Sequence, residues 1–239
     1  ESHVDNSFEL SELFLKENTH STLKLLNYIN SSESKIRLLH ISTDEVYGEI
    51  VGDAATELTR LHPTNPYAAT KAAGDLLAQT YRTCFNLDLK IIRANNIYGP
   101  RQFEEKLIPK AILNSKRSQI FLLHGTKKVK RHFVHVEDFV KAIELVFLNW
   151  ERDDVYIYNI AGNESYLVSE IVANIYSQNG LRPEEFIRTG PDRKFNDLEY
   201  KVKDTRIRDL GWEPKKKFWD ELEALNEQGS VLTRSAFDL

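Results

Sequence analysis

The sequence of 239 residues contains no methionine and a single cysteine. Because one cysteine, Cys84, cannot form an internal disulfide and the seven histidines lack the spacing of a zinc site, we expect no disulfide and no metal. This composition is typical of a protein from a reducing compartment, and we expect a cytoplasmic location. A native chain starts with methionine, so we do not expect Glu1 to be the natural start.

Long apolar runs and blocks of one charge sign are also missing. No run approaches the roughly 18 to 20 apolar residues of a membrane span, and the N-terminus does not resemble a signal peptide. The 32 basic and 36 acidic residues are interspersed, with a net charge of −4, so no basic stripe indicates a nucleic-acid or membrane partner. With 41% apolar residues, the chain can bury a sizeable core.

Strand-like and helix-like segments alternate in the first part of the chain. A short, nearly continuous apolar run at 36–41 predicts a buried parallel strand, and 87–93 is predicted to be the next strand. Apolar spacing predicts helices at 8–28, with an interruption near Asn18, and from Pro66 onward. This alternation predicts an α/β fold with a Rossmann-like, doubly wound parallel sheet.

The later part of the chain looks like a smaller, mixed lobe. Its predicted helices are 105–116, 136–149 and 167–178, and its predicted strands are 120–123, 131–134 and 155–160. We therefore divide the chain into three parts. Residues 1–95 are the C-terminal half of a Rossmann-like domain, residues 96–225 are mostly the second lobe, with some segments that return to the sheet, and residues 226–239 are a tail.

Reactive side chains occur where the first strand ends and the next helix begins. Thr43, Asp44 and Glu45 follow the strand, and ligands of open α/β sheets bind beyond the carboxyl ends of the strands. Tyr67 and Lys71 lie one helical turn apart, after an asparagine cap and a proline at the first helical position.

An ammonium beside a phenol lowers the phenol pKa from about 10, so that Tyr67 can act as a base. Taken alone, the pair is a weak signal, and a partly buried tyrosine with a solvated lysine is the favoured interpretation. Asp44 and Glu45 alone are compatible with an ordinary acidic turn.

Two segments carry a family resemblance: Ser42-Thr43-Asp44-Glu45-Val46-Tyr47-Gly48 and Asn65-Pro66-Tyr67-Ala68-Ala69-Thr70-Lys71. They resemble the extended short-chain dehydrogenase/reductase superfamily and, within it, the nucleotide-sugar 4,6-dehydratases that act on dTDP-glucose or UDP-glucose. Further matches extend the resemblance over nearly all of residues 1–215; they lie at 1–5, 93–109, 131, 192–197 and 204–214.

The resemblance implies an NAD-dependent lyase that oxidises a nucleoside-diphosphate glucose at C4, removes water across C5 and C6, and returns the hydride to C6. Tyr67, assisted by Lys71 and Thr43, would take the C4 hydroxyl proton. Glu45 would take the C5 proton, and Asp44 would protonate the departing C6 hydroxyl. Adjacent carboxylates in opposite roles need pKa values that are pushed apart.

The resemblance also implies binding residues and a homodimer. The residues expected to contact the cofactor are Ser2, Tyr67, Lys71 and Ile97. Those expected to contact the nucleotide sugar are Ser2, Thr43, Asn96, Lys106, Arg131, Asp192, Arg193 and Asn196. A planar guanidinium suits a diphosphate, yet Arg131 and Lys106 are also compatible with surface charge, and Asn96 with a turn.

The chain departs from the family pattern in two ways. The glycine-rich phosphate loop would precede Glu1, so we expect the isolated chain to bind NAD poorly or not at all and to expose sheet edges that favour aggregation. Glu17, Ser21, Glu104 and Glu199 replace residues common in relatives, and two of these acids fall near expected phosphate or sugar hydroxyl groups.

Other functions stay open on the sequence. A nucleotide-sugar epimerase or decarboxylase shares Tyr67 and Lys71, but epimerisation at C4 needs no acid at C6, so Asp44 and Glu45 favour the dehydratase. A truncated paralogue without activity is the third hypothesis. Thymidine and uridine both remain open as the carrier nucleoside.

Overall fold

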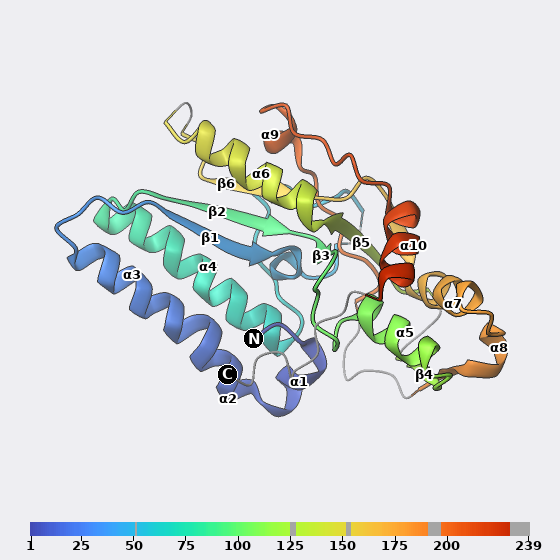
Figure 1. Ribbon diagram of the computed structural model, residues 1–239. Coiled ribbons are helices and arrows are strands. Elements are labelled where there is room, and N and C mark those ends of the chain that lie inside the picture. Colours follow the sequence, from blue (N-terminus) through green and yellow to red (C-terminus); the bar gives the residue numbers. More distant parts are fainter. Residues whose placement is uncertain (51, 125–127, 152–153, 191–196, 230–239) are drawn as a thin grey trace. The chain divides into compact units, whose positions relative to one another are not determined.

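The computed structural model describes residues 1–50, 52–124, 128–151, 154–190 and 197–229 (Figure 1). These residues form two compact units. The first unit contains residues 1–95, 144–161 and 200–212, and the second contains 96–143, 162–199 and the chain from residue 213. No helix in the described ranges has the length and apolarity needed to cross a membrane.

A parallel sheet forms the centre of the first unit. Its strands are, in spatial order, β1 (Leu38–Thr43), β2 (Leu89–Ala94) and β6 (Ile157–Ile160). The register pairs Thr43 with Ala94 and Ala94 with Ile160, so the three carboxyl ends are level. Every residue of β2 is buried, as expected for a strand covered on both faces, and this includes the charged Lys90 and Arg93.

Helix α4 (Pro66–Phe85) packs against β1 and β2, and α3 (Ser21–Ser31) lies beside α4 (Figure 1). The α4 helix begins at Asn65, whose side-chain oxygen accepts a bond of 2.8 Å from the Ala68 N–H, and it ends at Asn86 in the left-handed conformation. Small and apolar side chains on one stripe allow α4 to approach the sheet. The buried cluster here contains Leu26, Ala78, Leu89, Ile91 and Ile157.

The segment before β1 is less regular than the single helix predicted for 8–28. It consists of α1 (Val4–Glu9), α2 (Ser11–Phe14), a π-helix η1 (Leu15–His20) and α3. The interruption expected near Asn18 falls inside η1. There Asn18 donates to the Thr70 hydroxyl at 3.1 Å and the Thr19 hydroxyl donates to the Thr70 carbonyl at 2.9 Å, so side-chain bonds to α4 accompany the widened turn.

The second unit contains two small sheets. Strand β5 (Lys130–His135) pairs in parallel with β3 (Asn96–Tyr98) and antiparallel with β7 (Ser165–Leu167), and β4 (Phe121–Leu123) pairs with β8 (Ile187–Thr189). The core of this unit includes Tyr98, Ile112, Ile175, Phe218 and Leu222. These residues come mainly from α5 (Leu107–Lys116), α7 (Val168–Gln178) and α10 (Phe218–Gln228).

The remaining helices are short except for α6: α6 (Val136–Leu148), α8 (Pro183–Phe186), α9 (Thr205–Arg208) and the 3-10 helix η2 (Asp44–Tyr47). The predicted α/β fold with a parallel, Rossmann-like sheet is confirmed. Three strands were not predicted: β3 within a presumed loop, β7 before a helix, and β8 in the part after residue 178. Each has only three residues and is held by pairing with a distant strand, β3 and β7 with β5 and β8 with β4, which no local pattern reveals.

Candidate active site

Asp44 lies just beyond the carboxyl end of β1 and is buried. One of its carboxylate oxygens accepts a hydrogen bond of 3.0 Å from the Thr43 hydroxyl, and the other accepts one of 2.6 Å from the Asn95 amide. Asn95 follows the neighbouring strand β2. Because the register pairs residues 43 and 94, residues 44 and 95 are the next pair along the two strands.

Glu45 is half-buried and takes hydrogen bonds from other elements. Its Oε2 accepts a bond of 3.0 Å from the Asn65 amide and a longer one, 3.4 Å, from the Tyr200 hydroxyl. The backbone of this turn is fixed as well, since the Thr43 hydroxyl caps η2 by accepting from the Glu45 N–H. The two adjacent carboxylates therefore have separate hydrogen-bond partners.

Tyr67 lies on the first turn of α4 and is buried, with its ring edge-on to Phe14. Burial raises the pKa of Tyr67 above its usual value, and the negative charges of Glu45 and Asp44 raise it further, while a hydrogen bond with Thr43 acts in the opposite direction. The sequence predicted a lowered pKa. The difference arises because burial and two nearby carboxylates dominate, so the phenol keeps its proton in this arrangement.

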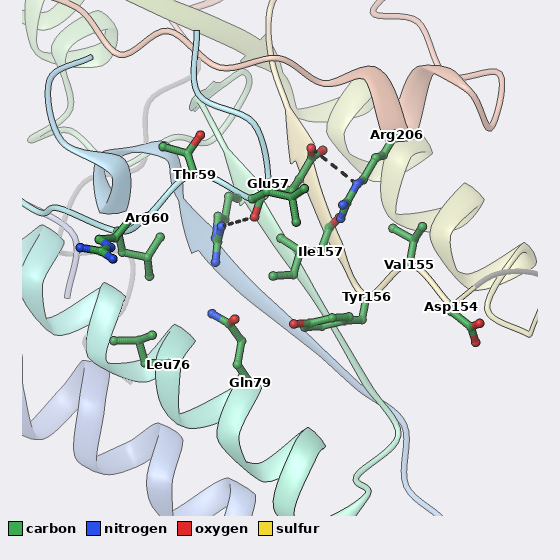
Figure 2. A pocket seen from close by; sticks show the side chains of 13 residues that line it. Glu57, Thr59, Arg60, Leu76, Gln79, Asp154, Val155, Tyr156, Ile157 and Arg206 are labelled. Atoms are coloured by element: carbon green, nitrogen blue, oxygen red, sulfur yellow. Dashed lines mark hydrogen bonds and ion pairs between the residues drawn. The ribbon is translucent and has the colours of Figure 1, made fainter. Parts of the chain in front are cut away.

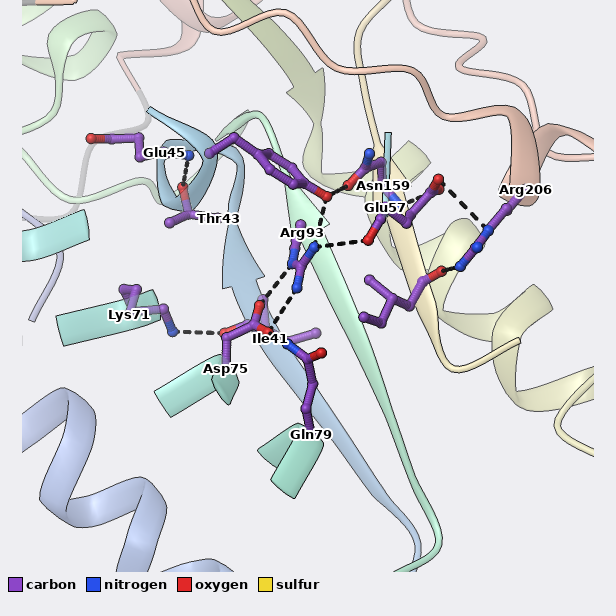
Figure 3. Close-up of polar contacts among 12 residues, drawn as sticks. Ile41, Thr43, Glu45, Glu57, Lys71, Asp75, Gln79, Arg93, Asn159 and Arg206 are labelled. Carbon is purple, nitrogen blue, oxygen red and sulfur yellow. Dashed lines mark hydrogen bonds and ion pairs between the residues drawn. The ribbon is translucent and has the colours of Figure 1, made fainter. Parts of the chain in front are cut away.

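Lys71 lies one turn after Tyr67, as predicted, but its ammonium faces β1. It donates a hydrogen bond of 2.7 Å to the Ile41 carbonyl (Figure 3). Burial lowers the pKa of Lys71, and the charge of Asp75 opposes this effect. Lys71 is not among the charges that shift the pKa of Tyr67.

Arg93 is a buried centre of hydrogen bonds that sequence reasoning did not single out (Figure 3). Its guanidinium binds Asp75 of α4 through two bonds of 2.8 Å and donates to the Tyr47 hydroxyl at 2.9 Å. Tyr47 in turn donates to Asn159 of β6 at 2.8 Å. An arginine inside the predicted strand 87–93 was the available signal, because a buried charge needs a partner.

This network joins the two parts of the candidate site. Asp75 belongs to the helix that carries Tyr67 and Lys71, whereas Tyr47 belongs to the turn that carries Asp44 and Glu45. A planar guanidinium bonded to both fixes one element against the other with directional contacts. Arg93 therefore helps to hold in place the two elements, α4 and η2, that carry the proposed catalytic residues.

The other predicted binding residues are spread over both units. Ser2 belongs to the first unit, and the four described residues Asn96, Ile97, Lys106 and Arg131 belong to the second. Asp192, Arg193 and Asn196 lie outside the described residues. Among the departures, Glu17 lies in η1 and Glu199 lies 3.2 Å from a ring nitrogen of His132.

Two of the predicted nucleotide-sugar contacts, Asn96 and Arg131, bond to the backbone of the second unit. The Asn96 amide donates to the His132 carbonyl at 3.1 Å. The Arg131 guanidinium donates to the carbonyls of Lys130, Asp197 and Leu198, at 2.7, 3.0 and 3.3 Å respectively. Lys106 precedes α5 and lies 3.9 Å from Glu105.

A cavity of about 700 Å³ opens in the first unit beside α4 (Figure 2). Glu57, Gln79, Arg93, Tyr156 and Arg206 are among its lining residues, and Arg206 donates to the Ile157 carbonyl at 3.0 Å. None of the five predicted catalytic residues lines this cavity. Within the described residues, no group of three or more histidine, cysteine or acidic side chains is arranged to hold a metal ion.

The parallel sheet, the Tyr-Lys helix and the polar turn after β1 place the protein in the extended short-chain dehydrogenase/reductase superfamily. Residues 1–224 match the model of a family described as GDP-mannose 4,6 dehydratase, so the chain belongs to this family.

Individual relatives are nucleotide-sugar enzymes. The trifunctional UDP-glucose 4,6-dehydratase/UDP-4-keto-6-deoxy-D-glucose 3,5-epimerase/UDP-4-keto-L-rhamnose-reductase RHM1 of Arabidopsis thaliana is 38% identical over 224 residues, which are 92% of this chain and 33% of that protein. The chain thus spans about a third of this relative's length. The dTDP-glucose 4,6-dehydratase of Streptomyces niveus is also 38% identical, over 93% of this chain and 65% of its own.

Solved structures agree with these matches. The crystal structure of DesIV, a dTDP-glucose 4,6-dehydratase from Streptomyces venezuelae with NAD bound, superimposes with a TM-score of 0.89 at 35% identity. The match covers 95% of this chain and 70% of DesIV. A UDP-glucose 4-epimerase of Thermus thermophilus has a TM-score of 0.85 at 24% identity, a likeness of fold alone, over 96% of this chain and 75% of the epimerase.

Proposed function

We propose that this chain carries the proton-transfer residues of a nucleotide-sugar 4,6-dehydratase, which converts a nucleoside-diphosphate glucose to its 4-keto-6-deoxy sugar. The observation that carries the proposal is the pair Asp44 and Glu45 at the end of β1, close enough to Tyr67 for both charges to act on its pKa. Elimination of water needs a base and an acid on neighbouring carbons. A C4 epimerase needs neither a base at C5 nor an acid at C6, so this pair favours the dehydratase over the epimerase.

NAD fits the donor groups of the first unit. The Lys71 ammonium has three N–H donors, of which the Ile41 carbonyl takes one, and the Tyr67 phenol still carries its proton. These groups suit the hydroxyls of a nicotinamide ribose, and with Ser2 and Ile97 they are our proposed cofactor contacts. When bound, NAD supplies the acceptor for the C4 hydride and the donor of the same hydride to C6.

Tyr67 is the proposed base for the C4 hydroxyl, assisted by Thr43 and Lys71. The phenol must lose the pKa increase that burial and the carboxylates cause here. The nearby cation able to offset it is Lys71, with its ammonium turned from the Ile41 carbonyl toward the phenol. Removing the proton from oxygen and the hydride from carbon turns the C4 alcohol into a ketone.

The ketone acidifies the C5 proton, and the two carboxylates complete the elimination. Glu45 takes the C5 proton while Asp44 donates a proton to the C6 hydroxyl, which leaves as water; the C5–C6 double bond then accepts the hydride at C6 and a proton at C5. The Asn65 amide bonds to Glu45 and the Asn95 amide bonds to Asp44. These separate partners support different roles for the two carboxylates, because the pKa of each can be adjusted independently.

Asn96, Lys106, Arg131, Asp192, Arg193 and Asn196 remain our proposed contacts to the nucleotide sugar, with Ser2 and Thr43. The guanidinium of Arg131 is suited to a diphosphate, although it is bonded to carbonyls here. We also propose a homodimer, for which exposed apolar side chains of α3 and α4 are candidate contacts: Leu25 and Tyr28 of α3 and Leu76 of α4 expose between 46% and 65% of their surface. We also propose a cytoplasmic location, because a single cysteine is typical of a protein from a reducing compartment.

The test uses the full-length protein that contains this chain, loaded with NAD and incubated separately with UDP-glucose and dTDP-glucose. NMR should detect a new C6 methyl group and loss of the C4 hydrogen signal with one of them. An Asp44→Asn variant should still oxidise C4, seen as absorbance of the reduced cofactor, but form little methyl product. If neither sugar is consumed while NAD is bound, the proposed function is wrong.

A further inference from the structure

Asn65 uses both ends of its side-chain amide. The oxygen accepts a hydrogen bond of 2.8 Å from the Ala68 N–H and caps α4. The nitrogen donates a bond of 3.0 Å to Oε2 of Glu45, a residue 20 positions earlier in the chain. Asn65 is also buried, with 6% of its surface exposed, so water competes little for either contact.

The cap determines which end of the amide meets Glu45. Because the Ala68 N–H can be accepted only by the amide oxygen, the NH2 group must face the carboxylate. Serine and aspartate cap helices about as well as asparagine, but a serine hydroxyl is too short to serve both sites and an aspartate would place a second negative charge beside Glu45. Asparagine is thus the capping residue that also supplies a donor here.

The contact couples the two elements of the proposed site. Asn65 stands two residues before Tyr67 on the chain, so the position of the Glu45 carboxylate is fixed relative to the first turn of α4. Asp44, Tyr67 and Tyr200 are among the ionisable groups near this carboxylate, and Tyr200 donates to it at a longer 3.4 Å. The Asn65 bond to Oε2, at 3.0 Å, is therefore shorter than the bond from Tyr200.

We propose that Asn65 is a positioning residue for Glu45: its amide orients the carboxylate and stabilises the ionised form that accepts the C5 proton. The inference rests on the proposed role of Glu45 as the base. It assigns to the asparagine before Pro66 a task in the elimination step in addition to the start of the helix.

The test compares Asn65→Ser, Asn65→Asp and Asn65→Ala in the full-length, NAD-loaded protein. The serine variant should keep the cap and wild-type unfolding, but its kcat should fall about tenfold to a hundredfold, as expected for loss of a hydrogen bond to a charged group. KM should change little. The aspartate variant should also move the acidic limb of the kcat–pH profile to higher pH, because a second negative charge favours protonation of Glu45.

A substrate labelled with deuterium at C5 isolates the affected step. The isotope effect on kcat should increase in Asn65→Ser, because transfer of the C5 proton becomes slower than the other steps. Asn65→Ala should show the same kinetic change and, in addition, lower stability from the lost cap. Asn149→Ser is the control: it removes an amide that donates to the Leu145 carbonyl on α6, and it should leave both kinetics and isotope effect unchanged.

The outcomes separate this inference from the proposed function. If the wild-type protein makes no 4-keto-6-deoxy product, the proposed function fails. If it makes the product and the serine and aspartate variants retain its kcat, pH profile and isotope effect, Asn65 is only a helix cap and the inference is wrong.

Discussion

Removing the negative charge of Asp75 is expected to lower the free energy of unfolding far more than removing the charge of a more exposed carboxylate. Asp75 is fully buried, and it neutralises Arg93, of which only 2% is exposed. The change Asp75→Asn keeps the shape of the side chain and removes its charge. It leaves the guanidinium buried with neutral partners only, the Tyr47 hydroxyl at 2.9 Å and the Glu57 carbonyl at 3.3 Å.

The magnitude follows from burial. Breaking a fully buried ion pair from one side costs about 3–5 kcal/mol in the free energy of unfolding, because the remaining charge stays desolvated. Two parallel bonds of 2.8 Å put this pair at the strong end. The pair Arg208–Asp204 is the matched control, with a bond of 2.9 Å between more exposed side chains, and Asp204→Asn should cost about 0.3–0.5 kcal/mol.

Urea unfolding followed by circular dichroism measures both variants against the wild type. The double variant Asp75→Asn/Arg93→Met should be more stable than Asp75→Asn, because methionine fills similar space without a charge. Equal losses for Asp75→Asn and Asp204→Asn would refute the argument, as would a double variant less stable than Asp75→Asn alone.

Three further perturbations test other features. Gly48→Ala should cost about 2 kcal/mol or more in urea unfolding, because Gly48 has a φ of 70° and a Cβ would lie 2.1 Å from the His62 carbonyl oxygen. Gly180→Ala is the control: Gly180 has a φ of 74° but open space around it, so the change should cost about 1 kcal/mol. Similar losses would contradict the steric account. Tyr47→Phe should cost about 1–3 kcal/mol by the same measurement, since a buried hydrogen bond on each side is lost, and a neutral result would rule out a structural role of the hydroxyl. Burial lowers the pKa of His40 from 6.5 to about 4, with help from the Lys71 charge, so the unfolded chain binds the proton more tightly. Stability should therefore fall by about 2–3 kcal/mol as the pH drops from 6.5 to 4, and His40→Gln should flatten this dependence in acid titrations; an unchanged slope would contradict the shift.

Local sequence patterns predicted a strand at 36–41, which the structure places at Leu38–Thr43, and the helix that starts at Pro66. The chemistry of the residues between them stays a proposal. The patterns could not predict the partners of those residues. The Arg93–Asp75 bond joins a strand to a helix, and the Asn95–Asp44 bond depends on which residues of two parallel strands are level. Such contacts are set by packing and register, which a one-dimensional pattern does not contain.

The direction of the Tyr67 pKa shift was missed for a related reason. Spacing along a helix placed Lys71 one turn away, but it could not reveal that the lysine ammonium bonds to the Ile41 carbonyl while the phenol is buried beside two carboxylates. The sign of the shift depends on burial and on the nearest charges, and both come from the tertiary structure.

The pairing of β1 with β2 makes the position of Asp44 relative to Asn95 depend on the lengths of the two strands. Both strands contain six residues and are paired from Leu38 with Leu89 to Thr43 with Ala94, so residues 44 and 95 leave the sheet at the same level. Deleting one residue within either strand would turn the residues beyond it to the opposite face. A single insertion or deletion inside either strand would therefore separate Asp44 from the Asn95 amide even where the sheet survives.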